Sequence, residues 1–332
     1  MTGPSSTGPA IEVADLVRTF TRYEKRGAIK RRRVETDAVR GLSLRIEPGS
    51  LVGYLGPNGA GKSTTVKMLT GILVPTSGRV RVLGLDPARE RIALARRIGV
   101  MFGQRVQLWW DLPLADSFEL LRHIYRVPAD RYRANLDRFR QLLDLDEFLA
   151  TPVRQLSLGQ RIRGELVASM LHDPEVLFLD EPTIGLDVVA KARVREFLAE
   201  INRERGVTIL LTTHDLGDIE RLCDRLLVLD RGALIYDGSL ATLKARYGDE
   251  RTLVVDLEEE RAPLDVPGAR VVRVEGPRQW LRFRRDETTA AQLAAAVGAQ
   301  ATLVDLAVEE ADIEDIVRRI YAGRAAGSDP DG

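Results

Sequence analysis

The sequence predicts an α/β protein with a mainly parallel sheet, followed by a small C-terminal α+β domain. Three observations predict this fold. Short apolar runs with the length of buried strands alternate with helical patterns. A Gly-rich loop joins one of these runs, residues 51–55, directly to a helix. After about residue 246 the pattern changes to strands with one exposed face and an Ala-rich helix.

The elements are justified in chain order by their periodicity. Residues 11–20 and 34–46 alternate as strands and predict a small antiparallel β subdomain. A helix begins at Lys62 and ends near Gly71, and residues 117–149 show a helical pattern. The helix over 158–171 ends at Asp173 and Pro174. Strands are expected at 176–179, 207–212, 226–229 and 233–236, and helices at 190–204 and 219–223.

The C-terminal part has its own set of elements. Residues 252–257, 270–274, 280–283 and 302–308 read as strands, and residues 288–296 and 313–321 as helices. We therefore expect a disordered tail over 1–10, a main domain over 11–246, an α+β domain over 247–322 and a disordered tail over 323–332. Within the main domain, residues from about 105 to 165 are expected to form a helical subdomain.

Composition excludes several classes of protein. The chain has 49 basic and 49 acidic residues, and this balance argues against a broad nucleic-acid-binding surface. Cys223 is the single cysteine, so no internal disulfide and no cysteine-cluster metal site can form. No apolar run approaches the roughly 20 residues that span a bilayer, and the N-terminus lacks the layout of a signal peptide. These features predict a cytosolic protein.

Residues 56–64, GPNGAGKST, fit the pattern G-x-x-x-x-G-K-[ST] between a predicted strand and a predicted helix. Glycines let backbone N–H groups turn inward around phosphate oxygens, and the positive end of the helix attracts the same anion. We expect Lys62 to bridge the β- and γ-phosphates of a nucleotide and the Ser63 hydroxyl to bind Mg²⁺. A chance Gly-rich turn is the alternative, and the flanking strand and helix argue against it. The expected phosphate-binding residues are Gly56, Pro57, Asn58, Gly59, Ala60, Gly61, Lys62, Ser63 and Thr64.

Two carboxylates follow the buried strand at 176–179. The carboxyl ends of strands are where ligands bind in an open α/β sheet. Asp180 is expected to hold Mg²⁺, mostly through water, and Glu181 to orient or deprotonate the attacking water. A strand that simply ends in an acidic turn is the alternative, which the phosphate-binding motif makes less convincing.

Five further motifs and residues occur in a fixed order around these two. LSLGQ at 156–160 resembles the ABC signature L-S-G-G-Q, and Gln104 in VMFGQ matches the Q-loop glutamine. Asp187 in GLD matches the D-loop, His214 matches the switch histidine, and Phe20 lies where an aromatic stacks on adenine. Together the motifs resemble those of the ABC transporter ATP-binding subunits over residues 11 to 246.

The resemblance implies a mechanism that needs two chains. In this family two ATPase domains pack head to tail, and each ATP lies between the phosphate-binding loop of one chain and the signature of the other. It implies that Ser157, Gly159 and Gln160 contact ATP, that Asp187 lies at the nucleotide, and that Gln104 contributes to Mg²⁺ binding. It also implies catalytic roles for Glu181, His214 and Gln104. Apart from the resemblance, Ser157 and Asp187 can each act as the N-cap of the helix that follows it. Leu158 departs from the family's glycine, which puts the strength of that contact in doubt.

Two segments leave alternatives open. Trp109 and Trp110 in FGQRVQLWWDLP follow Gln104 and are either anchors for a membrane subunit or core residues of the helical subdomain. Residues 22–33 carry seven Arg and Lys residues. One interpretation is that they contact anionic lipid headgroups or a permease loop, and the other is that they form a solvated loop between two strands.

The function that follows from the resemblance is Mg²⁺-dependent ATP hydrolysis coupled to solute transport. The Q-loop and the short C-terminal domain resemble those of bacterial exporters with separately encoded permeases, whereas an importer ATPase with a regulatory domain is the alternative. Partners would be membrane permeases and a second ATPase chain, identical or different, with no nucleic acid, at the cytoplasmic side of the cell membrane. A non-transport ABC ATPase is disfavoured because the chain has one phosphate-binding loop and no long coiled coil. A non-hydrolysing module would lack Lys62 or Glu181.

Overall fold

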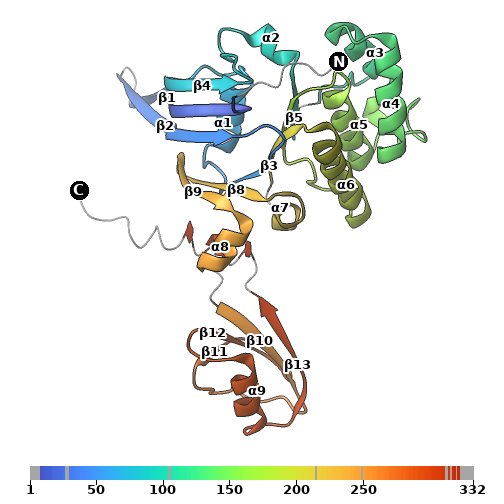
Figure 1. Ribbon diagram of the computed structural model, residues 1–332. Coiled ribbons are helices and arrows are strands. Elements are labelled where there is room, and N and C mark those ends of the chain that lie inside the picture. The colour runs from blue at the N-terminus through green and yellow to red at the C-terminus, as the bar shows by residue number, and fades with distance from the viewer. Residues whose placement is uncertain are drawn as a thin grey trace. The chain divides into compact units, whose positions relative to one another are not determined.

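The computed structural model describes residues 8–26, 30–103, 106–213, 215–247, 250–310, 313–314, 316–318 and 320–321. The chain divides into two compact units, Met1–Asp237 and Gly238–Gly332 (Figure 1). The boundary lies before helix α8 (Leu240–Tyr247), whereas the sequence pattern places the change after this helix. Among these residues, no helix has both the length and the apolar character needed to cross a membrane.

A six-stranded sheet forms the centre of the first unit, in the order β5-β6-β7-β3-β8-β9. The pairs β5–β6, β6–β7, β7–β3 and β3–β8 are parallel. Parallel strands covered on both faces are mostly apolar. Every residue of β3 and β7 is buried, and the polar residues of β7 are the threonines at its two ends. Because the strands are parallel, β3 and β6 end at the same edge of the sheet. The strands are β3 (Leu51–Leu55), β5 (Ile98–Phe102), β6 (Val176–Asp180), β7 (Thr208–Thr212), β8 (Arg225–Asp230) and β9 (Ala233–Ser239).

Helices α3, α4, α5 and α6 gather on one side of this unit (Figure 1). The helical pattern at 117–149 is in fact two helices, because Arg126 adopts a left-handed φ of 56° and Pro128 lacks an N–H donor. The helices of the unit are α1 (Lys62–Leu69), α2 (Arg91–Ala95), α3 (Leu114–Tyr125), α4 (Ala129–Leu143), η1 (Val153–Gln155), α5 (Leu158–Met170), α6 (Val188–Arg205) and α7 (Leu216–Leu222). Of these, α2 and η1 were not predicted from the sequence, nor were strands β4 (Ser77–Val82) and β5.

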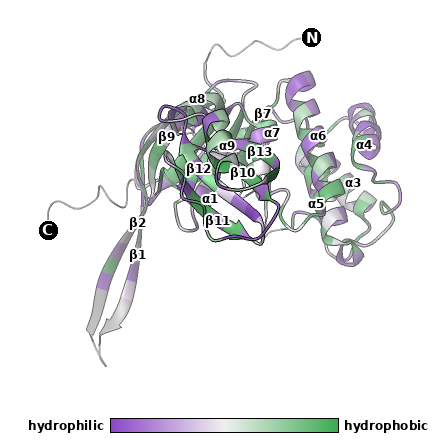
Figure 2. Cartoon of the chain, turned by 90° about the horizontal axis from the view of Figure 1, so that it is seen from below, coloured by the Kyte–Doolittle hydropathy of each residue, from purple (hydrophilic) through white to green (hydrophobic). Residues whose placement is uncertain are grey.

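A three-stranded antiparallel sheet in the order β2-β1-β4 completes the unit; its strands are β1 (Ile11–Arg26), β2 (Lys30–Ile46) and β4 (Ser77–Val82). The interpretation of residues 22–33 as a loop is wrong in extent, because β1 and β2 stay paired from Phe20 opposite Thr36 to Arg26 opposite Lys30. Figure 2 shows the two strands running side by side away from the rest of the unit. The predicted N-terminal tail is described from residue 8, and it includes the buried Ala10.

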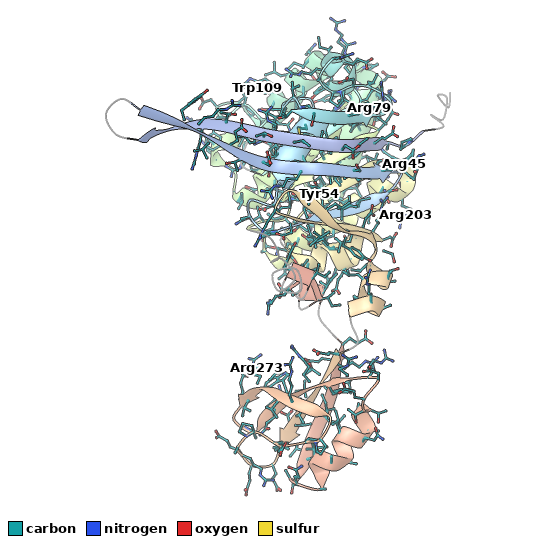
Figure 3. The ribbon with its side chains drawn as sticks, turned by 90° about the vertical axis from the view of Figure 1, so that its left-hand side faces the viewer. Arg45, Tyr54, Arg79, Trp109, Arg203 and Arg273 are labelled. Atoms are coloured by element: carbon teal, nitrogen blue, oxygen red, sulfur yellow. The ribbon has the colours of Figure 1, made fainter. Side chains whose placement is uncertain are left out.

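The second unit contains an antiparallel sheet in the order β11-β12-β10-β13, with helix α9 (Ala290–Gly298) packed on it. Its strands are β10 (Glu250–Leu257), β11 (Ala269–Glu275), β12 (Arg278–Arg284) and β13 (Leu303–Glu310). Alternate residues of β10 and β12, such as Leu253 and Leu281, bury one face against Leu293 of α9. The expected α+β composition of this part is confirmed. Arg273 lies over the ring of Trp280 on the sheet, and Figure 3 labels it there.

Candidate nucleotide-binding site

The loop between β3 and α1 has the backbone geometry that its glycines permit. Gly59 and Gly61 have φ values of 81° and 99°, which side chains with a Cβ rarely adopt. A Cβ on Gly56 would lie 2.8 Å from the carbonyl oxygen of Leu229, so the loop can approach β8 only with glycine there. Gly61 caps α1, which begins at Lys62 as predicted. The N–H groups of the first turn of α1 have no partners within the helix and can bind an anion.

Lys62 is folded against this loop and only 7% exposed. Its Nζ donates to the carbonyl oxygens of Gly56 and Pro57, the latter at 3.1 Å. Burial lowers the pKa of the Lys62 amine, while the carboxylates of Glu181 and Asp180 act in the opposite direction. The loop therefore holds a buried cation that faces two acidic residues from the end of another strand.

Asp180 ends β6 and meets the loop. Its Oδ2 accepts a hydrogen bond from the Ser63 hydroxyl at 3.3 Å, and its Oδ1 accepts one from the Thr212 hydroxyl at the end of β7. Hard oxygen donors of this kind suit Mg²⁺, which is bound by one or two protein oxygens while phosphates and water complete its coordination. Ser63 and Asp180 therefore fit the ion, and Thr212 is a partner of Asp180 that sequence reasoning missed, although it ends the neighbouring strand.

Glu181 holds an unusual backbone conformation beside this pair. Its φ is 56°, in the left-handed region, and its N–H donates to the Thr212 carbonyl at 2.9 Å. Such a conformation costs on the order of 1 kcal/mol in a residue with a side chain and is concentrated at functional sites. The neighbouring strand β7 thus fixes the direction in which Glu181 leaves β6.

A cavity of about 750 Å³ lies over the loop. Its volume is in the range of small-molecule sites, roughly 300–1,000 Å³. Most of the loop lines it, as do Asp180 and Glu181. Six lining residues were not predicted, because tertiary packing brings them in from β2, the region of α1, the end of β5 and the segment after Glu181. They are Ala38, Lys67, Ile72, Phe102, Gly103 and Ile184.

The signature residues occupy another part of the unit. Ser157 caps α5, as the sequence predicted, and accepts a hydrogen bond from the Gln160 N–H at 3.2 Å. The Gln160 side chain in turn accepts from the Ser157 N–H, which completes a capping box. Ser157, Gly159 and Gln160 are absent from the lining of the cavity formed by the described residues. One chain alone thus brings together the loop and the acidic pair but not the signature.

Asp187 and Phe20 also lie away from the cavity lining formed by the described residues. Asp187 caps α6 and accepts from the Ala190 N–H at 2.8 Å, so its capping role is confirmed. Phe20 lies on β1, 41% exposed, with the Arg18 guanidinium 4.7 Å from its ring centre. Gln104 and His214 lie outside the described residues.

Comparison with known proteins places this geometry in a family. The ABC transporter family pattern matches residues 39–184. The daunorubicin resistance ATP-binding protein DrrA3 of Streptomyces coeruleorubidus is 40% identical over 243 residues, which cover 73% of this chain and 74% of that protein. The chain belongs to the ABC transporter ATP-binding family. The ABC transporter ATP-binding protein NatA of Bacillus subtilis is 32% identical over 70% of this chain and 93% of its own.

A solved structure supports the same family. The ATP-binding subunit of an ABC transporter superimposes with a TM-score of 0.62 at 26% identity, and the match covers 72% of this chain and 93% of that one. Membership of the ABC transporter ATP-binding family confirms the P-loop α/β fold and the expectation that the chain uses ATP.

Proposed function

We propose that this ABC protein hydrolyses ATP with Mg²⁺ in the cavity over residues 56–64 and couples hydrolysis to solute export through separate permease subunits. The meeting of Ser63, Asp180 and Glu181 at one edge of the sheet carries the proposal. It brings a hydroxyl and a carboxylate that suit Mg²⁺, together with a second carboxylate, close to the buried cation of Lys62.

Each residue has a distinct task in this scheme. Lys62 and the N–H groups of the loop bind and orient the phosphates of ATP. Ser63 and Asp180 would hold Mg²⁺, which neutralises charge on the phosphates during transfer. Glu181, held by its backbone bond to Thr212, accepts a proton from the attacking water or orients it. Gln104 and His214 are proposed to complete the site from the segments that follow β5 and β7.

A second chain would complete each site. The signature helix α5 starts with Ser157 and Leu158, and the Leu158 side chain is 42% exposed rather than packed over the chain's own cavity. The first turn of a helix is a suitable donor set for a γ-phosphate. We therefore propose a head-to-tail homodimer in which Ser157, Gly159 and Gln160 of one chain face the ATP bound to the other, with Asp187 and Phe20 at its margins.

Other observations support the proposed export direction and the proposed use of separate permeases. DrrA3, a relative, is named for drug resistance, which supports export over import. Trp109 and Trp110 are 37% and 50% exposed, so the alternative that both are core residues is wrong. An exposed aromatic pair next to the Gln104 segment suits the binding of a permease at the cytoplasmic side of the membrane.

The decisive experiment measures ATP hydrolysis and substrate transport in the same preparation. The chain is co-expressed with the membrane subunits that co-purify with it. Phosphate release and substrate movement are then measured in inverted membrane vesicles with Mg-ATP, with ATP and EDTA, and with the Glu181→Gln variant. The proposal expects uptake into inverted vesicles, which corresponds to export, only with Mg-ATP and intact Glu181. Hydrolysis with movement in the opposite direction would support an importer, and no hydrolysis by chain or complex would refute the proposal.

A further inference from the structure

A buried carboxylate on the signature helix is not used by the nucleotide site. Glu165 of α5 is only 4% exposed. Its Oε1 accepts hydrogen bonds from the backbone N–H groups of Gln107, at 2.9 Å, and of Leu108, at 3.4 Å. Its Oε2 is also buried and has no hydrogen-bond partner among the described residues. An ionisable group is retained here at a desolvation cost, which a purely apolar contact would avoid.

The segment that Glu165 holds leads from the Gln104 region to the tryptophan pair. The Gln107 side chain donates to the Val100 carbonyl of β5, and the Trp109 N–H donates to the Ser117 hydroxyl of α3 at 3.2 Å. Leu108 is buried between them. Strand β5 and helices α3 and α5 therefore each form a hydrogen bond with residues 107–109, and Glu165 makes the contact from α5. Figure 3 labels Trp109 in this unit.

Helix α5 approaches this segment closely. A Cβ on Gly164 would lie 2.9 Å from Leu114 Cδ1 and 3.2 Å from Leu108 Cδ1, so glycine lets the helix come near enough for Glu165 to reach the backbone. Arg161, one turn earlier on α5, has its guanidinium 5.8 Å from the Trp110 ring centre. Two residues of α5 thus contact the segment that carries the exposed tryptophans.

We propose that Glu165 is a positioning residue that fastens the segment carrying Trp109 and Trp110 to the signature helix. Because α5 rises about 1.5 Å per residue as a rigid rod, Glu165 lies about 12 Å from the Ser157 end that faces the second ATP in the proposed dimer. A shift of α5 when ATP closes the dimer then moves the tryptophan surface with it. The link to a permease rests on the proposed function, whereas the fastening itself does not.

The protonation state of Glu165 sets the strength of this fastening. Burial raises the pKa of Glu165 to about 7, while the N–H groups of Leu108 and Gln107 and the charge of Arg161 act in the opposite direction. Among the described residues, Arg161 is the charged group that acts on the Glu165 carboxyl. Because this pKa lies above that of a solvated carboxyl group, the buried, fastened conformation favours the protonated form, so the segment is held less firmly as pH rises through 7.

Tryptophan fluorescence can report this directly. The chain has three tryptophans, so Trp280→Phe leaves Trp109 and Trp110 as the emitters. In the full chain with this change, acrylamide quenching is measured from pH 6 to 8.5, with and without Mg-ATP. We expect quenching to rise with pH, with a midpoint near pH 7, because the segment loosens as Glu165 ionises, and we expect the transition to be absent in Glu165→Gln. Mg-ATP should shift the tryptophan emission of the parent protein, and the shift should be at least threefold smaller in Glu165→Ala. Glu175→Gln, a carboxylate before β6 paired with Arg97, is the matched control and should behave like the parent.

The outcomes separate the two proposals. A transition near pH 7 that persists in Glu165→Gln, or one that the parent lacks, overturns the role of Glu165. If circular dichroism shows that Glu165→Ala does not fold, the test rests on Glu165→Gln. This variant keeps the shape of the side chain and one acceptor oxygen. If the parent shows the transition but neither the chain nor its complex with the permeases hydrolyses ATP, the proposed function fails and the fastening stands.

Discussion

The Ser63 hydroxyl donates a hydrogen bond to the Asp180 carboxylate at 3.3 Å, although the two residues are 117 positions apart in the chain. The contact exists because β3 and β6 are parallel strands of one sheet and end at the same edge. It joins the loop that can bind phosphates to the carboxylate that can bind Mg²⁺.

Replacing Lys62 with alanine removes the buried side-chain cation from the phosphate-binding loop. We expect both ATP binding and hydrolysis to weaken, with a loss of about 10²–10³ in rate, since loss of one stabilising donor typically has this effect. Nucleotide binding by fluorescence and phosphate release by the purified chain check it. Lys244→Ala, on α8 of the second unit, is the control. Unchanged turnover in Lys62→Ala would contradict the assignment of the loop.

Glu181→Gln should separate binding from hydrolysis. The loop, Ser63 and Asp180 remain, so Mg-ATP still binds, but an amide cannot accept a proton from water and turnover nearly stops. ATP then persists between two chains, and size-exclusion chromatography with Mg-ATP should show a dimer. Glu175 lies just before the same strand, and its carboxylate pairs with Arg97 at 2.6 Å. The Glu175→Gln variant is the control and should hydrolyse ATP normally. A Glu181→Gln protein that stays monomeric and turns over ATP would remove Glu181 from the mechanism.

Trp109→Ala and Trp110→Ala should weaken binding to the permease while leaving the ATPase activity of the free chain nearly unchanged. Both side chains are substantially exposed, and truncating an interface tryptophan often costs about 2 kcal/mol or more of binding free energy. Co-purification with the permeases measures the first effect and phosphate release the second. Trp280→Ala in the second unit is the matched control. Equal recovery of the complex with all three variants would exclude this surface as the docking site.

Breaking a buried ion pair should destabilise the first unit. Asp218 is fully buried, with one oxygen 2.5 Å from the Arg195 guanidinium and the other accepting from the Thr183 and Thr213 hydroxyls. Removal of one member of such a pair costs about 3–5 kcal/mol of unfolding free energy. Asp218→Ala should show this loss in urea denaturation. Asp256→Ala breaks an exposed Asp–Arg pair in the second unit and should cost much less. Equal losses in both variants would show that burial of the Asp218 pair has no special effect.

The stability of the chain should depend on the ionisation of Glu165. Its folded pKa of about 7 lies above its ordinary value of 4.5, so its contribution to stability is full below pH 4.5 and is lost as pH rises through 7. Between pH 6 and 8 this amounts to about 1 kcal/mol, by the linkage of 1.36 kcal/mol per pKa unit. Urea unfolding at both pH values should therefore show a smaller decrease for Glu165→Gln than for the unmodified chain. Parallel decreases would place the titration elsewhere.

Many local features could be predicted from the sequence because they depend on neighbouring residues. The strand, Gly-rich loop and helix around Lys62, the cap of α5 by Ser157 and the cap of α6 by Asp187 follow from glycine geometry and short-range hydrogen bonds. The extent of β1 and β2 through the basic segment did not follow, because cross-strand pairing overrides local composition there.

The sequence by itself determined which residues could bind phosphate and Mg²⁺, since the chemistry of a loop and of a strand end is local. Only the tertiary structure decided that Thr212 orients Asp180 and Glu181, that Ala38 and Ile72 line the cavity, and that Glu165 reaches Gln107 and Leu108. These contacts join strands and helices that are remote in the chain, and no local pattern encodes which strand becomes the neighbour of another. The physical reason is that strand order and helix packing are set by burial of the whole apolar surface, which single motifs do not report.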